Sequence, residues 1–306
     1  MNFRGLIVAV VVLGALGGVL YWSQHRKPPD EVAPVTTATV ILKVNAADVT
    51  QLTITQKTPV SVEKADGKWQ ITQPAPYPAD QEAVAGLLST LSGVNADRVV
   101  EDKASDRKQY GLDPPAVEVD IAGKGHAPQQ LLLGDETPAG GDVYAALGGD
   151  PRVFTIASFS KTSLDKSLND LRDKSLLTLS PDKVSRVEVL KKPEEIEFDR
   201  TKDGWQMLKP KPAVADSFAV NDLVRSLTGA KMDLSAPSDA SAEFARGTAV
   251  ATAKLTGDAG VQTLEVRKNK TDYYAKSSVV AGTYKVDSAL GQALDEKPED
   301  FQSKQK

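Results

Sequence analysis

Residues 68–91 read KWQITQPAPYPADQEAVAGLLSTL, and residues 204–227 read GWQMLKPKPAVADSFAVNDLVRSL. The second stretch matches the first at a constant distance of 136 residues, so that Trp69 corresponds to Trp205. In both stretches a strand-like apolar pattern leads into a proline-rich segment, and the pattern of an amphipathic helix follows. The chain therefore contains a duplicated unit, and this duplication decides its fold.

The helix of each copy carries an apolar stripe with the spacing i, i+3, i+4, i+7. The stripes are Val84, Leu87, Leu88 and Leu91 in the first copy and Val220, Leu223, Val224 and Leu227 in the second. Burying four such side chains contributes at most about 6–12 kcal/mol, which a domain of about 5–15 kcal/mol net stability cannot leave in water. We therefore predict that the stripes and the two tryptophans are core. Asp80 and Asp216 are placed to cap the helices.

The correspondence continues with small shifts as far as Asp170-Leu171 and Asp300-Phe301, which predicts a closing element with Leu171 or Phe301 pointing inward. Alternating apolar residues predict strands over 116–122, 129–133, 143–147 and 152–156, and a helix near 158–170. Because strands and helices are segregated, the expected fold class is α+β, with two tandem related units of antiparallel sheets and packed helices. One N-terminal transmembrane helix is expected to precede them.

Residues Gly5 to Trp22 form an uncharged apolar run, which as a helix spans roughly 27 Å, enough to cross a bilayer core. A cleaved signal peptide is the competing interpretation, but the run ends in Tyr-Trp and basic residues without a small-x-small site. We therefore expect an anchor over 1–22, a linker over 23–46, a first repeat over 47–178 and a second over 179–306. With three residues before Arg4, the large domain is expected on the periplasmic side of the bacterial inner membrane.

Composition excludes several classes of function. The net charge of −4 argues against nucleic acid. The absence of cysteine removes disulfides, thiolate metal sites and cysteine nucleophiles. Neither of the two histidines has a companion for a metal site or a triad, and the acidic pairs lack the spacing of a calcium loop. No catalytic residue, metal site or cofactor is predicted.

The stretch GDETPAGGD (134–142) has the composition of a loop that could cradle an anion, but it lacks the Lys-Ser/Thr of a P-loop. Its simplest role is a turn between strands that end at Leu133 and begin at Val143. As an interaction surface, the loop and the charged run after the last helix of the first copy give one candidate set: Gly134, Asp135, Thr137, Gly140, Tyr144, Asp170 and Arg172.

Four ordered motifs resemble the bacterial domain-of-unknown-function family DUF4340: YGLDPP (110–115), LGDETPAGGDVYA (133–145), PRVFTI (151–156) and DLRDKSLL (170–177). The second copy is degenerate, with Phe244 near the place of Tyr110 and none of the other motif loops. The resemblance implies a membrane-anchored envelope protein linked to gliding-motility-like ABC transport systems. It carries over no catalytic residue.

These observations lead to one expected function and an alternative. We expect a non-enzymatic, extracytoplasmic accessory or scaffold protein of an ABC-type export or motility complex, with the membrane and transporter permease or auxiliary subunits as partners. The alternative is a binding module for cell-wall glycan or a small envelope ligand, which would use the 134–142 loop and Tyr144. A hydrolase is the least favoured class, since no nucleophile lies with a base in the sequence.

Overall fold

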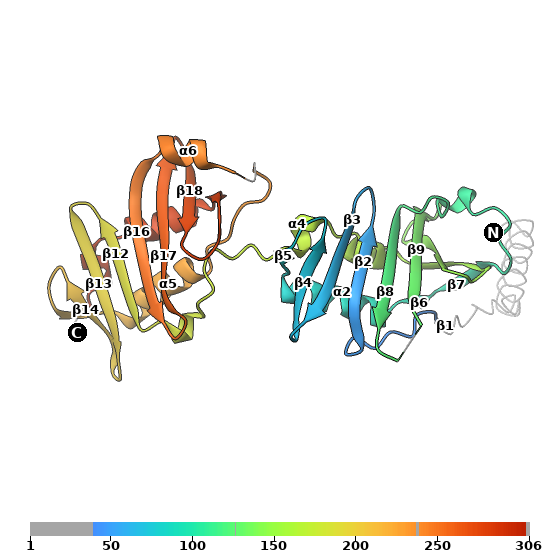
Figure 1. The fold of residues 1–306 in the computed structure, drawn as a ribbon, viewed down its shortest axis with the longest axis horizontal. Coiled ribbons are helices and arrows are strands. Elements are labelled where there is room, and N and C mark those ends of the chain that lie inside the picture. Colours follow the sequence, from blue (N-terminus) through green and yellow to red (C-terminus); the bar gives the residue numbers. More distant parts are fainter. Residues whose placement is uncertain (1–38, 126, 237–238, 304–306) are drawn as a thin grey trace, which may run out of the picture.

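The computed structural model describes residues 39–125, 127–236 and 239–303. Two antiparallel sheets follow one another along this part of the chain, each with helices packed against it (Figure 1). This is the α+β fold with two units that the duplication predicts. The expected anchor over 1–22 and most of the expected linker lie outside the described residues. Within the described ranges, no helix has the length and apolar character needed to span a membrane.

The first sheet has nine strands in the order β5-β4-β3-β2-β8-β9-β10-β11-β7. Its strands are β2 (Val49–Thr55), β3 (Pro59–Ala65), β4 (Lys68–Gln73), β5 (Tyr77–Pro78), β7 (Arg98–Glu101), β8 (Val117–Gly123), β9 (Gln129–Glu136), β10 (Asp142–Leu147) and β11 (Val153–Ala157). The helices of this unit are α2 (Gln81–Ser92), the 3₁₀ turn η1 (Lys108–Tyr110), α3 (Ser158–Leu164) and α4 (Leu168–Leu171). A separate two-stranded ladder pairs β1 (Thr39–Val40) with β6 (Asn95–Ala96).

The second sheet has eight strands in the order β15-β14-β13-β12-β16-β17-β18-β19. Its strands are β12 (Arg186–Lys191), β13 (Glu194–Thr201), β14 (Gly204–Lys209), β15 (Ala213–Val214), β16 (Thr248–Gly257), β17 (Gly260–Asn269), β18 (Asp272–Ser277) and β19 (Thr283–Val286). Its helices are η2 (Pro181–Lys183), α5 (Ser217–Thr228), α6 (Ser241–Arg246), α7 (Ser288–Asp295) and η3 (Pro298–Phe301). The strand order matches the first sheet position by position, except that β7 has no counterpart in it.

The two long helices begin as predicted. The Asp80 carboxylate accepts hydrogen bonds from the backbone N–H groups of Glu82 and Ala83, at 3.0 and 3.1 Å. Asp216 accepts from Phe218 and Ala219, at 2.9 and 3.3 Å. Each aspartate thus satisfies two of the N–H groups that the first turn of a helix leaves without an internal partner.

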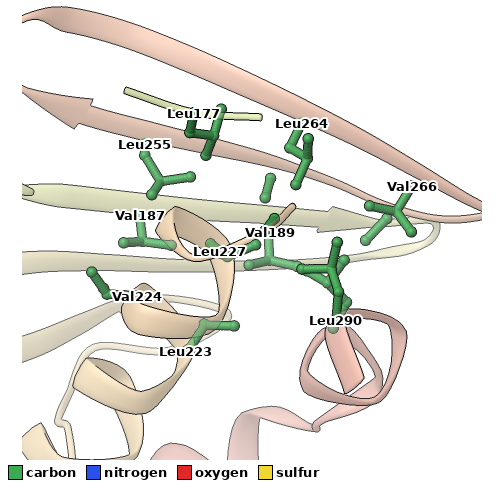
Figure 2. Packing of buried hydrophobic residues seen from close by; sticks show 14 of the residues in the cluster. Leu177, Val187, Val189, Leu223, Val224, Leu227, Leu255, Leu264, Val266 and Leu290 are labelled. Carbon is green, nitrogen blue, oxygen red and sulfur yellow. The ribbon is translucent and has the colours of Figure 1, made fainter. Parts of the chain in front are cut away.

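Each sheet has its own hydrophobic core, which the helix stripe fills. Figure 2 shows Leu223, Val224 and Leu227 of α5 beside Val187, Val189 and Leu255 of the second sheet. All eight stripe residues are buried, and the side chains of Trp69 and Trp205 are only 6% and 4% exposed. The prediction that these residues are core is confirmed, as the free energy of burying them requires.

The last turn of each unit returns to the start of the unit's long helix. The N–H of Asp80 donates to the carbonyl of Leu171, and the N–H of Asp216 donates to the carbonyl of Phe301, both at 2.8 Å. The side chains of Leu171 and Phe301 are buried, and the Phe301 ring meets Phe198 edge-on at 5.1 Å between centroids. The predicted closing element is therefore present in both units.

Two local predictions were wrong. The single helix expected near 158–170 is two short helices, because the capping box of Ser167 and Asp170 starts a new helix after α3 ends at Leu164. The strand expected to end at Leu133 continues to Glu136, which pairs with Val143, so the turn shrinks to residues 137–141. Short capping signals and bulges decide both features, and the apolar alternation does not report them.

Each core also includes residues that precede the unit's expected start. Leu42, in the expected linker, is buried in the first core, and Leu177 is buried in the second. The chain enters both units in the same way, because β1 pairs with β6 in the first and Ser175 bridges to Lys231 in the second. The duplicated unit is therefore longer at its N-terminal side than the hydrophobic pattern indicates.

The outer faces of the two sheets differ in chemistry at equivalent positions. In the first unit, beside a bulge at Ser61, the hydroxyl groups of Thr53 and Ser61 lie 2.9 Å apart and Ser61 donates to Gln73 at 3.5 Å. In the second unit the bulge falls at Glu197, whose side chain is 4% exposed and forms ion pairs with Arg186 and, at 3.0 Å, with Lys209. A neutral hydrogen-bond network in one copy is thus an ionic network in the other.

We predict that Glu197→Gln lowers the free energy of unfolding by about 1–2 kcal/mol, because it leaves Arg186 and Lys209 against a neutral amide. Urea denaturation at low and high salt measures this loss, which should shrink at high salt. The matched variant Ser61→Ala in the first unit should show a loss that does not depend on salt. Equal stability of Glu197→Gln and the wild type would show that the ionic network contributes nothing.

Candidate functional site

The predicted interaction residues fall into two separate places on the first sheet. Gly134, Asp135, Thr137, Gly140 and Tyr144 lie on β9, β10 and the turn between them. Asp170 and Arg172 lie beside β5, which is an edge strand separated from β9 by four strands in the strand order. The structure therefore does not bring the seven residues together into one surface.

The first group forms a packed corner with η1, which we call the motif corner and define as residues 110–115 and 134–144. The rings of Tyr110 and Tyr144 lie 4.9 Å apart between centroids. The Tyr110 hydroxyl donates to the carboxylate of Glu101 at 2.9 Å. This hydrogen bond and the desolvation of the phenol raise the pKa of Tyr110. Tyr144 is thus held against its own unit.

Two glycines allow the motif corner to close. A Cβ atom at Gly134 would lie 2.1 Å from the carbonyl oxygen of Tyr110, so only glycine fits. A Cβ atom at Gly111, which has φ of 65°, would lie 2.5 Å from the Asp135 carboxyl carbon. The Lys161 ammonium group donates to the Gly134 carbonyl at 2.6 Å and fixes α3 to the corner. The YGL and LGD motifs are therefore complementary parts of one packing contact.

The turn between β9 and β10 is internally hydrogen-bonded. The N–H of Thr137 donates to the Asp142 carbonyl, and the N–H of Gly140 donates to the Thr137 carbonyl, both at 2.9 Å. Thr137 is buried, whereas Asp135 is exposed at the rim. Gly140 has φ of 74° with open space around it, so its requirement is the left-handed backbone and no ligand is needed to explain it.

The second group joins the units. Asp170 accepts from the N–H of Ser167 at 2.8 Å, and hydrogen bonds from Ser167 lower the pKa of its carboxyl group. The Arg172 guanidinium lies over the Tyr77 ring of the first unit, 4.1 Å from its centroid. It also donates to the hydroxyl of Tyr284 in the second unit at 3.4 Å. Arg172 is thus a junction residue that contacts both units through aromatic side chains.

The degenerate second copy also has two aromatic residues at the positions of the Tyr110–Tyr144 pair of the motif corner. Phe244 and Tyr274 are buried in a common small cluster, in the places of Tyr110 and Tyr144. The guanidinium of Arg267, which stands where the first copy has Gly134, lies 4.6 Å from the Phe244 ring centroid. The expectation that Phe244 takes the place of Tyr110 is therefore confirmed.

A groove of about 780 Å³ opens on the first unit between the β2–β3 turn and the α3–α4 link. It is lined by polar and apolar side chains that include Lys57, Asp165, Lys166 and Leu168, and Tyr144 does not line it. Among the described residues, no group of three or more His, Cys, Asp or Glu side chains is placed to hold a metal ion. The groove therefore offers charged side chains without an assembled catalytic set.

The sequence did not predict the roles of three residues that hold the motif corner together: Glu101, Tyr110 and Lys161. Tyr110 lies in a motif that the resemblance identified, but its hydroxyl contact with Glu101 joins residues in different elements. Lys161 gives no signal in the sequence, because a lysine in an amphipathic helix is normally solvated. Tertiary proximity alone assigns these roles.

We predict that Gly134→Ala lowers the free energy of unfolding by about 2–3 kcal/mol, because its methyl group would overlap the Tyr110 carbonyl. Gly86→Ala is the matched control, since Gly86 lies in α2 with open space around it and alanine favours helix there by about 0.5–1 kcal/mol. Urea denaturation should thus give effects of opposite sign. Equal effects would contradict the tight contact at Gly134.

The model of one family, Domain of unknown function (DUF4340), matches residues 69–244 and 205–305. The two matches begin at Trp69 and Trp205, the equivalent residues of the duplication. No curated protein and no solved structure matches the chain. Together the two matches extend over most of the chain, which therefore belongs to the DUF4340 family.

Proposed function

We propose that this protein is a non-enzymatic accessory or scaffold subunit of an ABC-type export or gliding-motility-like complex. In this proposal the apolar run over 5–22 anchors it in the bacterial inner membrane, with both units on the periplasmic side. The run is long enough to cross a bilayer core. The resemblance to DUF4340 members linked to such systems suggests the partner class.

The observation that carries the proposal is an exposed apolar pair on the second unit. Val214 of β15 and Phe218 in the first turn of α5 are 71% and 73% exposed. The first unit has Pro78 and Glu82 at the equivalent positions. There the carbonyl of Pro78 accepts from the N–H of Asp173, in the segment that leads to the second unit.

The second unit makes the same backbone contact, because the carbonyl of Val214 accepts from the N–H of Ser303. In the second unit the corresponding edge presents two large apolar side chains to solvent, a feature typical of a surface that a protein partner covers. The occupant that we propose is a periplasmic part of a transporter permease or auxiliary subunit. Exposed apolar residues at such an edge favour a protein partner over a polar ligand.

The glycan-binding alternative receives less support from the geometry. It requires the Tyr144 ring to be free to stack on a sugar, whereas this ring packs against Tyr110. The turn residues that would surround the sugar are bonded to one another, with Thr137 buried. The groove beside Lys57 and Asp165 meets the motif corner only at Pro115, and Tyr144 does not line it.

The proposal is tested by purifying the full-length protein from mild-detergent extracts and identifying bound subunits by mass spectrometry. We expect an ABC permease or ATPase to copurify with the wild type and to be lost at least tenfold with Phe218→Glu. This variant installs the residue that the first unit carries at Glu82, so the fold should tolerate it.

The matched control is Phe159→Ala, which removes an aromatic side chain of similar exposure from the first unit and installs the residue found at Ala289 in the second. It should leave copurification unchanged. Recovery of no transporter subunit with the wild type under several mild conditions would refute the proposal. Equal loss with both variants would refute the assignment of the partner to the β15–α5 edge.

A further inference from the structure

An equivalent pair of hydrogen bonds marks one location in both units. The N–H of Asp97 donates to the carbonyl of Thr155, and the N–H of Asp233 donates to the carbonyl of Lys285, both at 2.8 Å. In each unit the nearby strand also begins with an aspartate, Asp142 in β10 and Asp272 in β18. Two aspartates thus accompany residue 155 in the first unit and residue 285 in the second.

The second unit neutralises its two aspartates internally. The Lys285 ammonium group lies 3.0 Å from the Asp272 carboxylate, and this contact raises the pKa of Lys285. The charge of Lys285 also helps to lower the pKa of Asp233, whose carboxylate accepts first of all from the hydroxyl and N–H of Ser235. An ammonium group and a hydroxyl group therefore satisfy this pair of carboxylates.

The first unit keeps the aspartates and lacks both of these partners. Threonine 155 stands in place of Lys285, and Val99 stands in place of Ser235. Within the described ranges, the hydroxyl of the fully buried Thr155 and one buried carboxylate oxygen of Asp97 have no hydrogen-bond partner. Burial raises the pKa of Asp97, and the Asp142 carboxylate raises it further.

The strand register directs Thr155 and Asp142 to one face. Thr155 is paired with Tyr144 across the β10–β11 ladder, so the two side chains share a face of the sheet. Asp142 precedes Tyr144 by two residues and shares that face as well. Lys285 is paired with Tyr274 in the same way, and its ammonium group reaches the aspartate at the start of the strand. The Thr155 hydroxyl therefore points to the side of the sheet that carries Asp142.

We propose that Asp97, Asp142 and the hydroxyl of Thr155 bind a divalent cation of the Ca²⁺ type, in the place that the Lys285 ammonium group takes in the second unit. All three residues offer oxygen, the ligand that Ca²⁺ and Mg²⁺ prefer. Two carboxylates and one hydroxyl leave the remaining coordination positions to water, which places the affinity in the weak range of about 10⁻⁴–10⁻³ M. This site is independent of the proposed scaffold function.

The test is the thermal unfolding of the full-length protein in detergent, in EDTA and in about 10 mM Ca²⁺ or Mg²⁺. We expect Ca²⁺ to raise the Tm of the wild type by about 3–10 °C. Ca²⁺ should also slow amide hydrogen exchange in peptides from β7, β10 and β11. The variant Thr155→Lys supplies the ammonium group of the second unit, so it should melt higher than the wild type in EDTA and lose the response to Ca²⁺.

Two further variants make the result specific. Lys285→Thr should create a second Ca²⁺ response, with slower exchange in β18 and β19. Asp142→Asn should remove the wild-type response while leaving the protein folded in EDTA, because it relieves the repulsion of Asp97. A wild type that responds to neither cation, as expected if water alone meets these oxygens, would overturn the proposal. So would a Thr155→Lys variant that keeps the full response.

Discussion

The hydrogen bond from the N-cap aspartate of the long helix to the last turn of its unit is the contact on which each unit depends. The backbone N–H of Asp80 donates to the carbonyl of Leu171, and the backbone N–H of Asp216 donates to the carbonyl of Phe301, both at 2.8 Å. Each hydrogen bond fixes the last turn of the unit against the start of its long helix. The side chain of Leu171 or Phe301 is then buried in the core of that unit. An aspartate at this position both caps a helix and closes a unit.

The packing of the hydrophobic core explains which positions stayed alike in the two copies and which diverged. The stripes of α2 and α5 are under the same packing constraint, so they remain apolar in both copies. Outside the core, the first unit has neutral groups around Ser61 where the second has ions around Glu197. The YGLDPP and LGDETPAGGD loops exist only in the first unit, and there they pack against one another through Gly134 and Gly111. The residues of these loops therefore have a packing role that does not require a binding partner.

The sequence predicted the features that both copies repeat at equivalent positions, and it missed those that depend on contacts between residues far apart in the chain. The helix stripes, the Asp80 and Asp216 caps and the closing residues follow from spacing that either copy repeats. The break after Leu164 was missed, because one capping box outweighs the apolar pattern. The junction role of Arg172 was also missed, since Tyr77 and Tyr284 lie far from it in sequence. The orphaned groups near Asp97 appear only once β7 and β11 are paired.

The most direct test of closure is amide hydrogen exchange of the full-length protein carrying Leu171→Ala, read separately in peptides from residues 49–171 and 176–303. Because each unit has its own core, we expect protection to fall across the first sheet and α2 and to stay unchanged in the second sheet and α5. Phe301→Ala should give the mirror result. An equal loss of protection in both halves from either substitution would contradict the account of two separately closed units.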